Sequence, residues 1–356
     1  MDIITLAHGS GGKESYKLIE EIFYKYFNNA ELLQQNDSTI LNEIKGKIAI
    51  TTDSFVIDPI FFSGGDIGKL SVCGTVNDLA VSGARPLYIT SAFIIEEGFE
   101  IEALKKIVKS MADTAKEAGV KIVAGDTKVV EKGKGHKIYI NTTGIGEFTD
   151  EQYELNMKNI EVGDKIILSG TMGDHGMCIM NEREGLDIES NIKSDCATLN
   201  KLTSDIMSVS KEIRIMRDPT RGGVANTLNE LVNSSSKSMM IYENMLSINE
   251  EVMNFCEMLG IDPLYVANEG KLLCIVSSSE SEKVINIMNE NKLGKDAKII
   301  GEVIENFKSK SQSTAKDINE GYRLVIGNGQ ALYMTTKLGA IKIIPMAQGE
   351  LLPRIC

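Results

Sequence analysis

The chain has 356 residues, 42% of them hydrophobic, and a formal net charge of −12 at pH 7. This length predicts two or three domains with an ample core, and an acidic chain without a long Lys/Arg cluster is not expected to bind nucleic acid. Six cysteines without a C-x-x-C pair and only three histidines predict neither a zinc site nor a disulfide framework, so we expect a reducing cytoplasm. No apolar run approaches the roughly 18 residues of a membrane span, so no membrane association is expected.

A glycine-rich loop lies near the N-terminus, in the sequence His8-Gly-Ser-Gly-Gly-Lys13. Apolar residues at helical spacing follow it over 18–26, so the loop is expected to open into a helix. The amides of Gly11 and Gly12, together with Lys13, would suit the phosphates of a ligand. Taken alone, the pattern is more typical of a flexible N-terminal lead.

Strands and helices alternate through the next hundred residues. Along strand 121–128, the alternation of side chains places Asp126 and Lys128 on one face. Helix 65–81 has small and apolar residues around its circumference, so it is expected to be mostly buried. Hydrophobic patterns predict strands over 47–52, 87–95, 121–128 and 137–145 and helices over 65–81 and 100–118.

Aspartates recur near the ends of these elements, at Asp37, Asp53, Asp78 and Asp126. Mg²⁺ is commonly held by a few carboxylates plus nucleotide phosphates, so a magnesium-nucleotide site is one interpretation. Each aspartate taken singly is more often a helix cap or a turn residue. The sequence contains neither the G-x-x-x-x-G-K-[ST] motif nor the glycine loop of protein kinases, which excludes an ordinary P-loop or kinase site.

The composition turns polar over 148–163, where we place a domain boundary. We therefore expect an α/β chain with domains at 1–152 and 153–335, followed by a C-terminal strand and tail at 336–356. The second half predicts helices over 174–184, 197–208, 222–233, 250–259 and 280–291, strands over 238–242, 271–276, 298–304 and 322–326, and a last apolar run over 340–345.

The last residue of the sequence is a cysteine, Cys356. Gly349 and Pro353 argue against a regular helix or central strand before it, so its thiol is free to swing. Arg354 favours the thiolate, whereas the adjacent α-carboxylate opposes it. The tail suits a carrier arm, although these residues alone are more simply a chain end that happens to be cysteine.

Several sequence blocks together resemble the HypE family of hydrogenase maturation proteins, which are carbamoyl dehydratases of the aminoimidazole ribonucleotide synthetase (PurM-like) superfamily. The Asn77-Asp78 and Gly125-Asp-Thr127 blocks are typical of the superfamily, whereas the end Pro353-Arg-Ile-Cys356 is specific to this branch. The resemblance covers nearly the whole chain and lies in the blocks 8–12, 62–68, 74–79, 125–130, 141–146, 218–224, 267–271 and 353–356.

The resemblance implies a two-domain PurM-like fold whose N-terminal domain pairs with that of a second copy to close a β-barrel. It also implies that Cys356 receives a carbamoyl group as a thiocarboxamide, which is dehydrated with ATP to a thiocyanate. That product would supply the cyanide ligand for the iron of NiFe hydrogenase. The implied partners are a carbamoyltransferase, HypF, as donor and a HypC–HypD complex as cyanide acceptor.

The resemblance further implies roles for individual residues. Lys128 and Glu269 would polarise the carbamoyl amide and take its proton. Read from local composition alone, Glu269 is a solvated turn residue, Lys128 is as readily a partner of Asp126, and His175 is a surface loop residue. The aspartates at positions 37, 53, 78 and 126 would bind Mg-ATP, supported by Asn77, Thr127 and the glycine loop with Gly11, Gly12 and Lys13.

Two other classes of function stay open at this point. A small-molecule kinase or synthetase of the same superfamily, of the selenophosphate or thiamine-phosphate type, would share the aspartates. It would have no use for a terminal cysteine, and a selenophosphate synthetase would want a cysteine in the glycine loop, where this sequence has none. A non-catalytic scaffold would use the tail only to dock a partner.

Overall fold

The computed structural model describes residues 2–34, 38–148, 154–184, 190–306 and 330–349. These divide into two compact units, 2–148 with 178–204 and 154–177 with 205–349. The segment 178–204 therefore groups with the first unit. This grouping differs from the continuous second domain that we expect over 153–335. The predicted domain ranges stay predictions. No described helix combines the length and the apolar composition that a bilayer-spanning segment requires.

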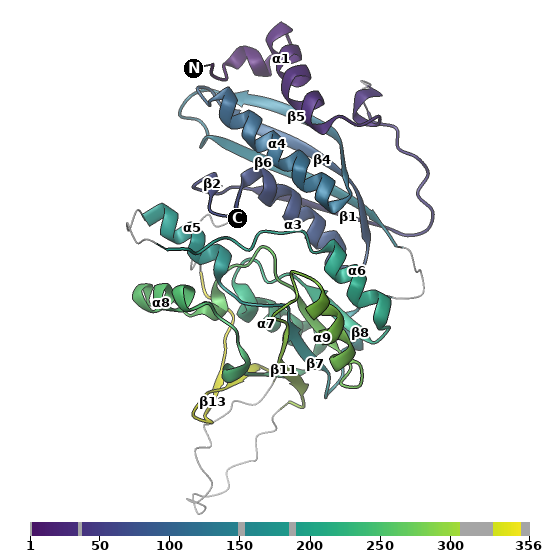
Figure 1. The fold of residues 1–356 in the computed structure, drawn as a ribbon, viewed down its shortest axis with the longest axis vertical. Helices are drawn as coiled ribbons and strands as arrows, with labels where there is room; N and C mark the ends of the chain where they lie inside the picture. The colour runs from purple at the N-terminus through teal and green to yellow at the C-terminus, as the bar shows by residue number, and fades with distance from the viewer. Residues whose placement is uncertain (1, 35–37, 149–153, 185–189, 307–329, 350–356) are drawn as a thin grey trace, which may run out of the picture. The chain divides into compact units, whose positions relative to one another are not determined.

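The first unit is built on a four-stranded sheet with the strand order β1-β6-β4-β5 (Figure 1). β6 runs antiparallel to both its neighbours, and β4 and β5 are parallel, as their connection through a helix requires. The four strands are β1 (Ile48–Phe55), β4 (Arg85–Glu96), β5 (Lys121–Val130) and β6 (Ile138–Glu147).

Two helices cover one face of this sheet, α3 (Ile67–Val81) and α4 (Ile101–Ala118). α3 is buried over nearly its whole length, as its small and apolar sequence predicts, and its N-cap Asp66 accepts hydrogen bonds from the amides of Gly68 and Lys69. α4 is amphipathic and ends at Gly119, whose φ of 72° is the left-handed conformation that glycine adopts most readily. A short hairpin of β2 (Phe61–Phe62) and β3 (Gly65–Asp66) precedes α3.

The opposite face of the sheet is open and partly apolar. On the edge strand β1, Ile48 and Ile50 are 57% and 69% exposed, and on β4 Ile94 is 44% exposed. The register pairs Ile50 with Ile145, and Ile145 with Tyr88, so a continuous row of apolar side chains crosses this face.

The N-terminal segment lies beside β5 (Figure 1). It begins with a 3₁₀ turn, Leu6–Gly9, and continues as α1 (Lys13–Leu18), a π-helical turn Ile19–Tyr24 and α2 (Lys25–Phe27). A second 3₁₀ turn spans Leu32–Gln34. The expected helix after the glycine loop is therefore present, with a widened turn at its centre.

The second unit contains a seven-stranded sheet with the order β13-β12-β9-β11-β7-β10-β8. All its pairs are antiparallel except β12 with β9, so this unit is α+β in character. Its strands are β7 (Lys165–Leu168), β8 (Ile213–Arg217), β9 (Ser238–Tyr242), β10 (Leu273–Val276), β11 (Lys298–Ile304), β12 (Leu332–Thr335) and β13 (Ile341–Ile343).

The helices of the second half are α5 (Asp174–Glu184), α6 (Asn200–Val209), α7 (Gly223–Ser235), α8 (Glu250–Leu259) and α9 (Ser281–Glu290). The mixed α/β architecture predicted from the sequence is confirmed, and the bounds of α8 match the predicted ones. β7, β8 and β12 were not predicted, and the strand expected over 322–326 lies outside the described residues. The barrel expected with a second copy stays a prediction.

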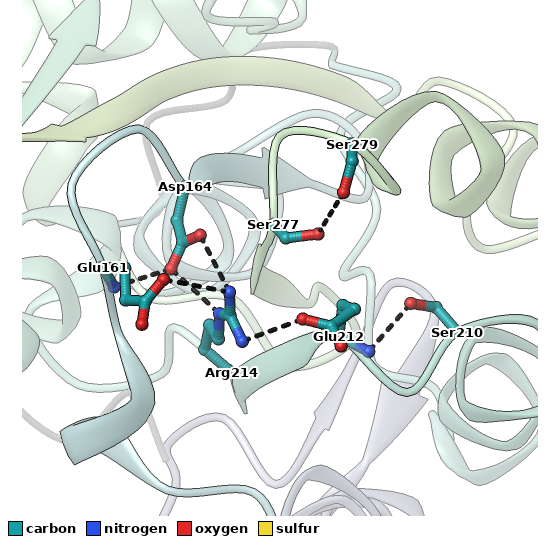
Figure 2. A network of polar contacts seen from close by, with 7 residues as sticks. All are labelled: Glu161, Asp164, Ser210, Glu212, Arg214, Ser277 and Ser279. Carbon is teal, nitrogen blue, oxygen red and sulfur yellow. Dashed lines mark hydrogen bonds and ion pairs between the residues drawn. The ribbon is translucent and has the colours of Figure 1, made fainter.

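Arg214 on β8 forms ion pairs with the turn before β7 (Figure 2). The side chain of Arg214 is 17% exposed and contacts Asp164 at 3.1 Å, Glu212 at 3.1 Å and Glu161 at 3.6 Å. Asp164 also accepts a hydrogen bond of 2.7 Å from the amide of Glu161. Burial lowers the pKa of Arg214, but the hydrogen bond to Asp164 and the surrounding carboxylates outweigh it and raise the pKa above its usual value.

Candidate functional site

A cavity of ≈ 320 Å³ lies in the first unit, between the N-terminal segment and the strands β4 and β5. This is the size at which small-molecule sites begin. It brings together two predicted parts of the site that are far apart in the sequence, Gly11 of the glycine loop and the strand residues Asp126, Thr127 and Lys128. The apolar and hydroxyl residues that complete the lining were not predicted, because their approach depends on the tertiary fold.

The glycine loop lies directly on β5. A Cβ at Gly9 would be 2.7 Å from the backbone nitrogen of Val129, so only glycine allows this approach. Gly11 has a φ of 78°, and its amide donates a 3.0 Å hydrogen bond to Ser15 Oγ, which in turn donates to the carbonyl of Ala7. The loop is thus held in a defined shape rather than forming a flexible lead, and Lys13 is the first residue of α1.

The two ends of the cavity differ in character along β5. At the end formed by the first residues of β5, Asn29 and Thr39 donate hydrogen bonds to the carbonyls of Ile122 and Val123. These bonds hold the segment 27–32 against the strand, and its apolar residues Phe27 and Leu32 line the cavity. At the other end, the glycine loop sits over Val129, next to Lys128. The cavity therefore runs from an apolar end to an end with loop amides and a cation.

Asp126 and Lys128 form an ion pair of 3.1 Å between Lys128 Nζ and Asp126 Oδ1. Both side chains are more than 60% exposed, so the pair contributes little to stability. The register places them opposite Ala92 and Ile94 on the open face of the sheet, which confirms that they share a face. Their charges are accessible to a ligand.

Asp53 and Asp78 lie at the other edge of the sheet. Thr51 Oγ1 donates a 2.7 Å hydrogen bond to Asp78 on α3, and Asp53 shares the helix-covered face of β1 with Thr51. Because β1 and β5 are three strands apart, these two aspartates are separated from the β5 edge by about 14 Å.

The three predicted carboxylates that the structure describes are therefore not gathered within a single chain. Among the described residues there is no group of three His, Cys, Asp or Glu side chains placed to hold a metal ion. Asp37 lies outside the described residues. Asp53, Asp78 and Asp126 thus stay predicted ligands, and within one chain they fit Mg²⁺ only as a partial donor set.

Asn77 is buried and binds the backbone of the segment that follows α5. Its Nδ2 donates to the carbonyl of Ala197 at 3.1 Å, and its Oδ1 accepts from the amide of Leu199 at 2.7 Å. The side chain is 1% exposed. Both amide atoms thus hold two distant segments of the first unit together.

Glu269 lies in the second unit and is 2% exposed, so its interpretation as a solvated turn residue is wrong. The neighbouring Asn268 is completely buried and donates to the carbonyls of Pro219 and Val266, while its Oδ1 accepts from the amide of Gly173. These three bonds fix the backbone from which Glu269 projects. The local sequence has the composition of a turn, but the burial of Glu269 depends on contacts with distant segments, which local composition does not reveal.

His175 is also completely buried and belongs to α5, so its interpretation as a surface loop residue is wrong. It follows Asp174, which lies 3.4 Å from Lys271 Nζ and accepts a hydrogen bond from Asn249. The start of α5 is therefore enclosed by charged and amide side chains, which the local sequence does not reveal.

The five described cysteines are all buried, as expected for small core residues. Burial raises the pKa of Cys274 to about 12 and, with the charge of Glu182, that of Cys178 to about 12. Since the thiolate is the reactive form, these thiols are inert at neutral pH. Cys356 lies outside the described residues.

Comparison with known proteins gives matches over nearly the whole chain. Residues 35–148 match the family "AIR synthase related protein, N-terminal domain" and residues 161–313 its C-terminal counterpart. The chain is 43% identical to the carbamoyl dehydratase HypE of Cupriavidus necator, covering 99% of this chain and 95% of that one. It is 40% identical to the Escherichia coli protein of the same name, covering 100% of both.

Solved structures give the same result. A crystal structure of the hydrogenase maturation protein HypE in complex with ATP has a TM-score of 0.89 and 41% identity, covering 99% of both chains. HypE in a HypE–HypF complex has a TM-score of 0.76 and 46% identity, covering 93% of this chain and 99% of that one. A thiamine-monophosphate kinase from Stenotrophomonas maltophilia, at 17% identity and a TM-score of 0.65, shares the fold alone.

Proposed function

Because the chain belongs to the HypE family of the AIR synthase related proteins, we propose that it is an ATP-dependent carbamoyl dehydratase. Its substrate is a carbamoyl group carried as a thiocarboxamide on Cys356, and its product is the thiocyanate that supplies cyanide for the iron of NiFe hydrogenase. The observation that carries the proposal is the identity of at least 40% to carbamoyl dehydratases along the whole chain.

The reaction explains why ATP is needed. The amide oxygen is a poor leaving group until it is phosphorylated by the γ-phosphate, after which the C–O bond breaks and phosphate departs with that oxygen. The nitrogen loses two protons as the C≡N bond forms, so the carbamoyl group loses the elements of water and ATP becomes ADP and phosphate. This step requires a cation near the developing negative charge and a base near the nitrogen.

Lys128 and Glu269 are the residues that we assign to these two tasks. Lys128 is accessible at the loop end of the cavity, where an ammonium can neutralise charge on a transferred phosphoryl group or on the amide oxygen. Glu269 is held on a backbone fixed by Asn268, as a general base requires if it is to reach one proton reproducibly.

ATP binds, in this proposal, in the cavity of the first unit. The amide of Gly12, together with Lys13 and Lys128, provides a donor and positive charge for the phosphates at the loop end, whereas Gly11, whose amide donates to Ser15 Oγ, shapes the loop. Thr127 lines the same cavity. Mg²⁺, which bridges and neutralises nucleotide phosphates, needs only one or two protein carboxylates beside them.

A second copy of the chain completes the site in this proposal. The aspartates of the β1 edge and the β5 edge are too far apart within one chain to hold the same phosphates. The open face of the sheet, with Ile48, Ile50 and Ile94 exposed, is apolar enough to pair with the same face of another chain and close a barrel. Asp53 and Asp78 of one chain would then serve the nucleotide bound beside Asp126 of the other.

We further propose that HypF donates the carbamoyl group and that a HypC–HypD complex accepts the cyanide. The similarity to HypE in a HypE–HypF complex supports the first of these. A carrier thiol must stay reduced between partners, so the function also fits a reducing cytoplasm.

The intact mass of the purified chain tests the proposal. After incubation with a HypF carbamoyltransferase, carbamoyl phosphate and Mg-ATP, we expect the mass of one added carbamoyl group less one water. The Glu269→Gln variant should stop at the full carbamoyl mass, and Cys356→Ala should gain neither. If the wild-type chain hydrolysed ATP while Cys356 stayed unmodified, the proposal would fail in favour of a small-molecule kinase or synthetase.

A further inference from the structure

The chain after β13 runs along α7 before it enters the carrier tail. Ile344 is 3% exposed and belongs to the core of the second unit, and its carbonyl accepts a 3.1 Å hydrogen bond from Asn229 Nδ2. Three residues later, the amide of Ala347 donates to Asn226 Oδ1 at 2.8 Å. Two asparagines one turn apart on α7 thus hold the backbone of segment 344–347, which we call the root of the tail.

A tyrosine holds the same root from a second element. Tyr265 ends the 3₁₀ turn Pro263–Tyr265, packs against the core of the second unit and donates from its hydroxyl to the carbonyl of Pro345 at 2.8 Å. Side chains therefore bind the backbone of the root at three points, although most of the residues after Ile344 are exposed. These bonds fix the direction of the chain, which the burial of Ile344 alone does not do.

The two asparagines also define which way the root runs. Position 344 lies at Asn229 and position 347 at Asn226, so the chain runs toward the N-terminal end of α7. Asn226 is the fourth residue of this helix, which begins at Gly223. The tail that follows Ala347 therefore starts near the first turn of α7.

The first turn of α7 lies against the segment that carries Glu269. A Cβ at Gly223 would be 2.6 Å from the carbonyl oxygen of Val266, so only glycine allows this contact. In the turn before the helix, the carbonyl of Pro219 accepts hydrogen bonds from both the amide and Nδ2 of Asn268, the residue before Glu269. The root of the tail and Glu269 are therefore fixed to the same part of the second unit.

A carrier tail serves only the space that its end can reach. Cys356 follows Ala347 by nine residues. A chain of that length spans at most about 30 Å when it is extended. The local concentration of the carried group at Glu269 therefore depends on where the tail begins and on the direction in which it leaves.

We propose that Asn226, Asn229 and Tyr265 orient the carrier tail, by holding its root so that the chain leaves toward Glu269. The inference rests on the carbamoyl dehydratase function proposed above and deepens it, because it names the residues that deliver the carried group to the base. All three are positioning residues, since they contact the root and not the reacting atoms.

The test combines Asn226→Leu with Tyr265→Phe in the full chain. Leucine has nearly the shape of asparagine but accepts no hydrogen bond, and phenylalanine lacks only the hydroxyl. Isocyanic acid, supplied as cyanate, adds to the Cys356 thiol and loads the thiocarboxamide without a partner protein. Saturating Mg-ATP then starts a single turnover, which intact mass follows as the loss of one water.

The expected effect is modest and has two sources. Releasing the root lengthens the free tail from nine to twelve residues, which dilutes its end about 1.5-fold. Loss of a fixed direction opens about twice the space to it, so the rate of water loss should fall about 3-fold in all. The dissociation constant for Mg-ATP should stay that of wild type, because the root does not line the cavity of the first unit.

A conservative variant separates orientation of the tail from a structural role. Asn226→Asp keeps an oxygen that accepts from the Ala347 amide, so it should retain the wild-type rate. Asn254→Leu makes the matched change at an exposed asparagine of α8 and should also leave the rate unchanged.

Two results would overturn the assignment. One is an unchanged rate in the double variant. The other is an equal loss of rate in Asn226→Asp, which would mean that Asn226 shapes α7 rather than the root. In both, loaded wild type still loses water, so the proposed function survives. If loaded wild type lost no water with Mg-ATP, the proposed function itself would fail, and the orientation of the tail with it.

Discussion

The polar groups of the two units are satisfied to different degrees. In the second unit, Arg214 and Asp164 are nearly buried, and each of their polar groups has partners within the chain (Figure 2). In the first unit, Lys128 is 65% exposed with Asp126 as its ion-pair partner, and Ser91 is buried with none among the described residues. We infer that the groups completed within one chain stabilise the fold, whereas the incomplete ones that line the cavity are available to a ligand or a second chain.

The comparison predicts opposite consequences for substitutions in the two regions. Changing a completed network should lower the free energy of unfolding and leave nucleotide affinity alone. Changing the incomplete site should lower nucleotide affinity and leave the free energy of unfolding nearly unchanged. Each of the following predictions tests one side of this distinction.

The largest effect on stability is expected for Arg214→Met. It leaves Asp164, whose side chain is 5% exposed, without its cation, and breaking such a pair should cost about 2–4 kcal/mol in the free energy of unfolding. Urea denaturation measures this, with calorimetry showing unchanged affinity for Mg-ATP. A loss below about 0.5 kcal/mol would place Arg214 among ordinary surface ion pairs.

The largest effect on activity is expected for Lys128→Met. The ammonium is exposed and contributes little to stability, so the unfolding free energy should change by less than about 1 kcal/mol. Conversion of the thiocarboxamide, followed by intact mass, should slow about 100-fold, as for loss of one group that stabilises developing charge. The matched control is Lys109→Met, which removes an exposed ion pair with Asp113 on α4 and should leave the rate unchanged.

Shared sites can be tested with mixed dimers purified through two different affinity tags. If Asp126 of one chain and Asp78 of the other serve the same nucleotide, a dimer of Asp126→Asn with Asp78→Asn keeps one intact site and about half of the activity. A wild-type chain paired with a chain carrying both substitutions should then be inactive. Half activity in the second dimer, with none in the first, would place both aspartates in a site within one chain.

Patterns along a single segment of the sequence correctly predicted helix bounds and the faces of a strand. The amphipathic helix before Gly119, the bounds of α8 and the shared face of Asp126 and Lys128 all follow from periodicity along one segment. The buried helix α3 was also predicted, and the cost of Asp78 within it is offset by the hydroxyl of Thr51.

Features that depend on distant partners were not predicted. Glu269 and His175 have the neighbours of surface residues in the sequence, but folding buries both of them. Their chain neighbours Asn268 and Asp174 are held by contacts with Gly173 and with Asn249 and Lys271. Ser91 has no sequence signal, since a serine in a strand is unremarkable until its surroundings are known to be closed. The predicted aspartates were singled out because they recur near the ends of elements and match a family resemblance. Their separation across the sheet follows from strand order, which local spacing does not encode.

The smallest effect on stability is expected at the cluster of Glu302, Lys165 and Tyr242, whose polar groups are paired with one another but partly exposed. Glu302 on β11 accepts from Lys165 at 2.5 Å and from the hydroxyl of Tyr242 at 2.7 Å, and its side chain is 32% exposed. The hydrogen bond from Lys165, followed by that from Tyr242, lowers the pKa of Glu302 below its usual 4.5. Glu302 therefore binds a proton less readily in the folded protein than in the unfolded chain.

The sign of the pH dependence follows from this shift. The stabilisation by Glu302 is fully present above its unfolded pKa of 4.5 and is lost as the pH falls through the lower folded value. Glu302→Gln should cost less than about 1 kcal/mol at pH 7, because solvent screens the pair, and the difference from wild type should shrink below pH 4. Urea denaturation between pH 3 and 7 measures it, with Glu282→Gln on α9 as an exposed control. A difference that stayed constant down to pH 3 would mean that Glu302 acts through packing rather than charge, and that completeness of a polar network alone does not determine its contribution to stability.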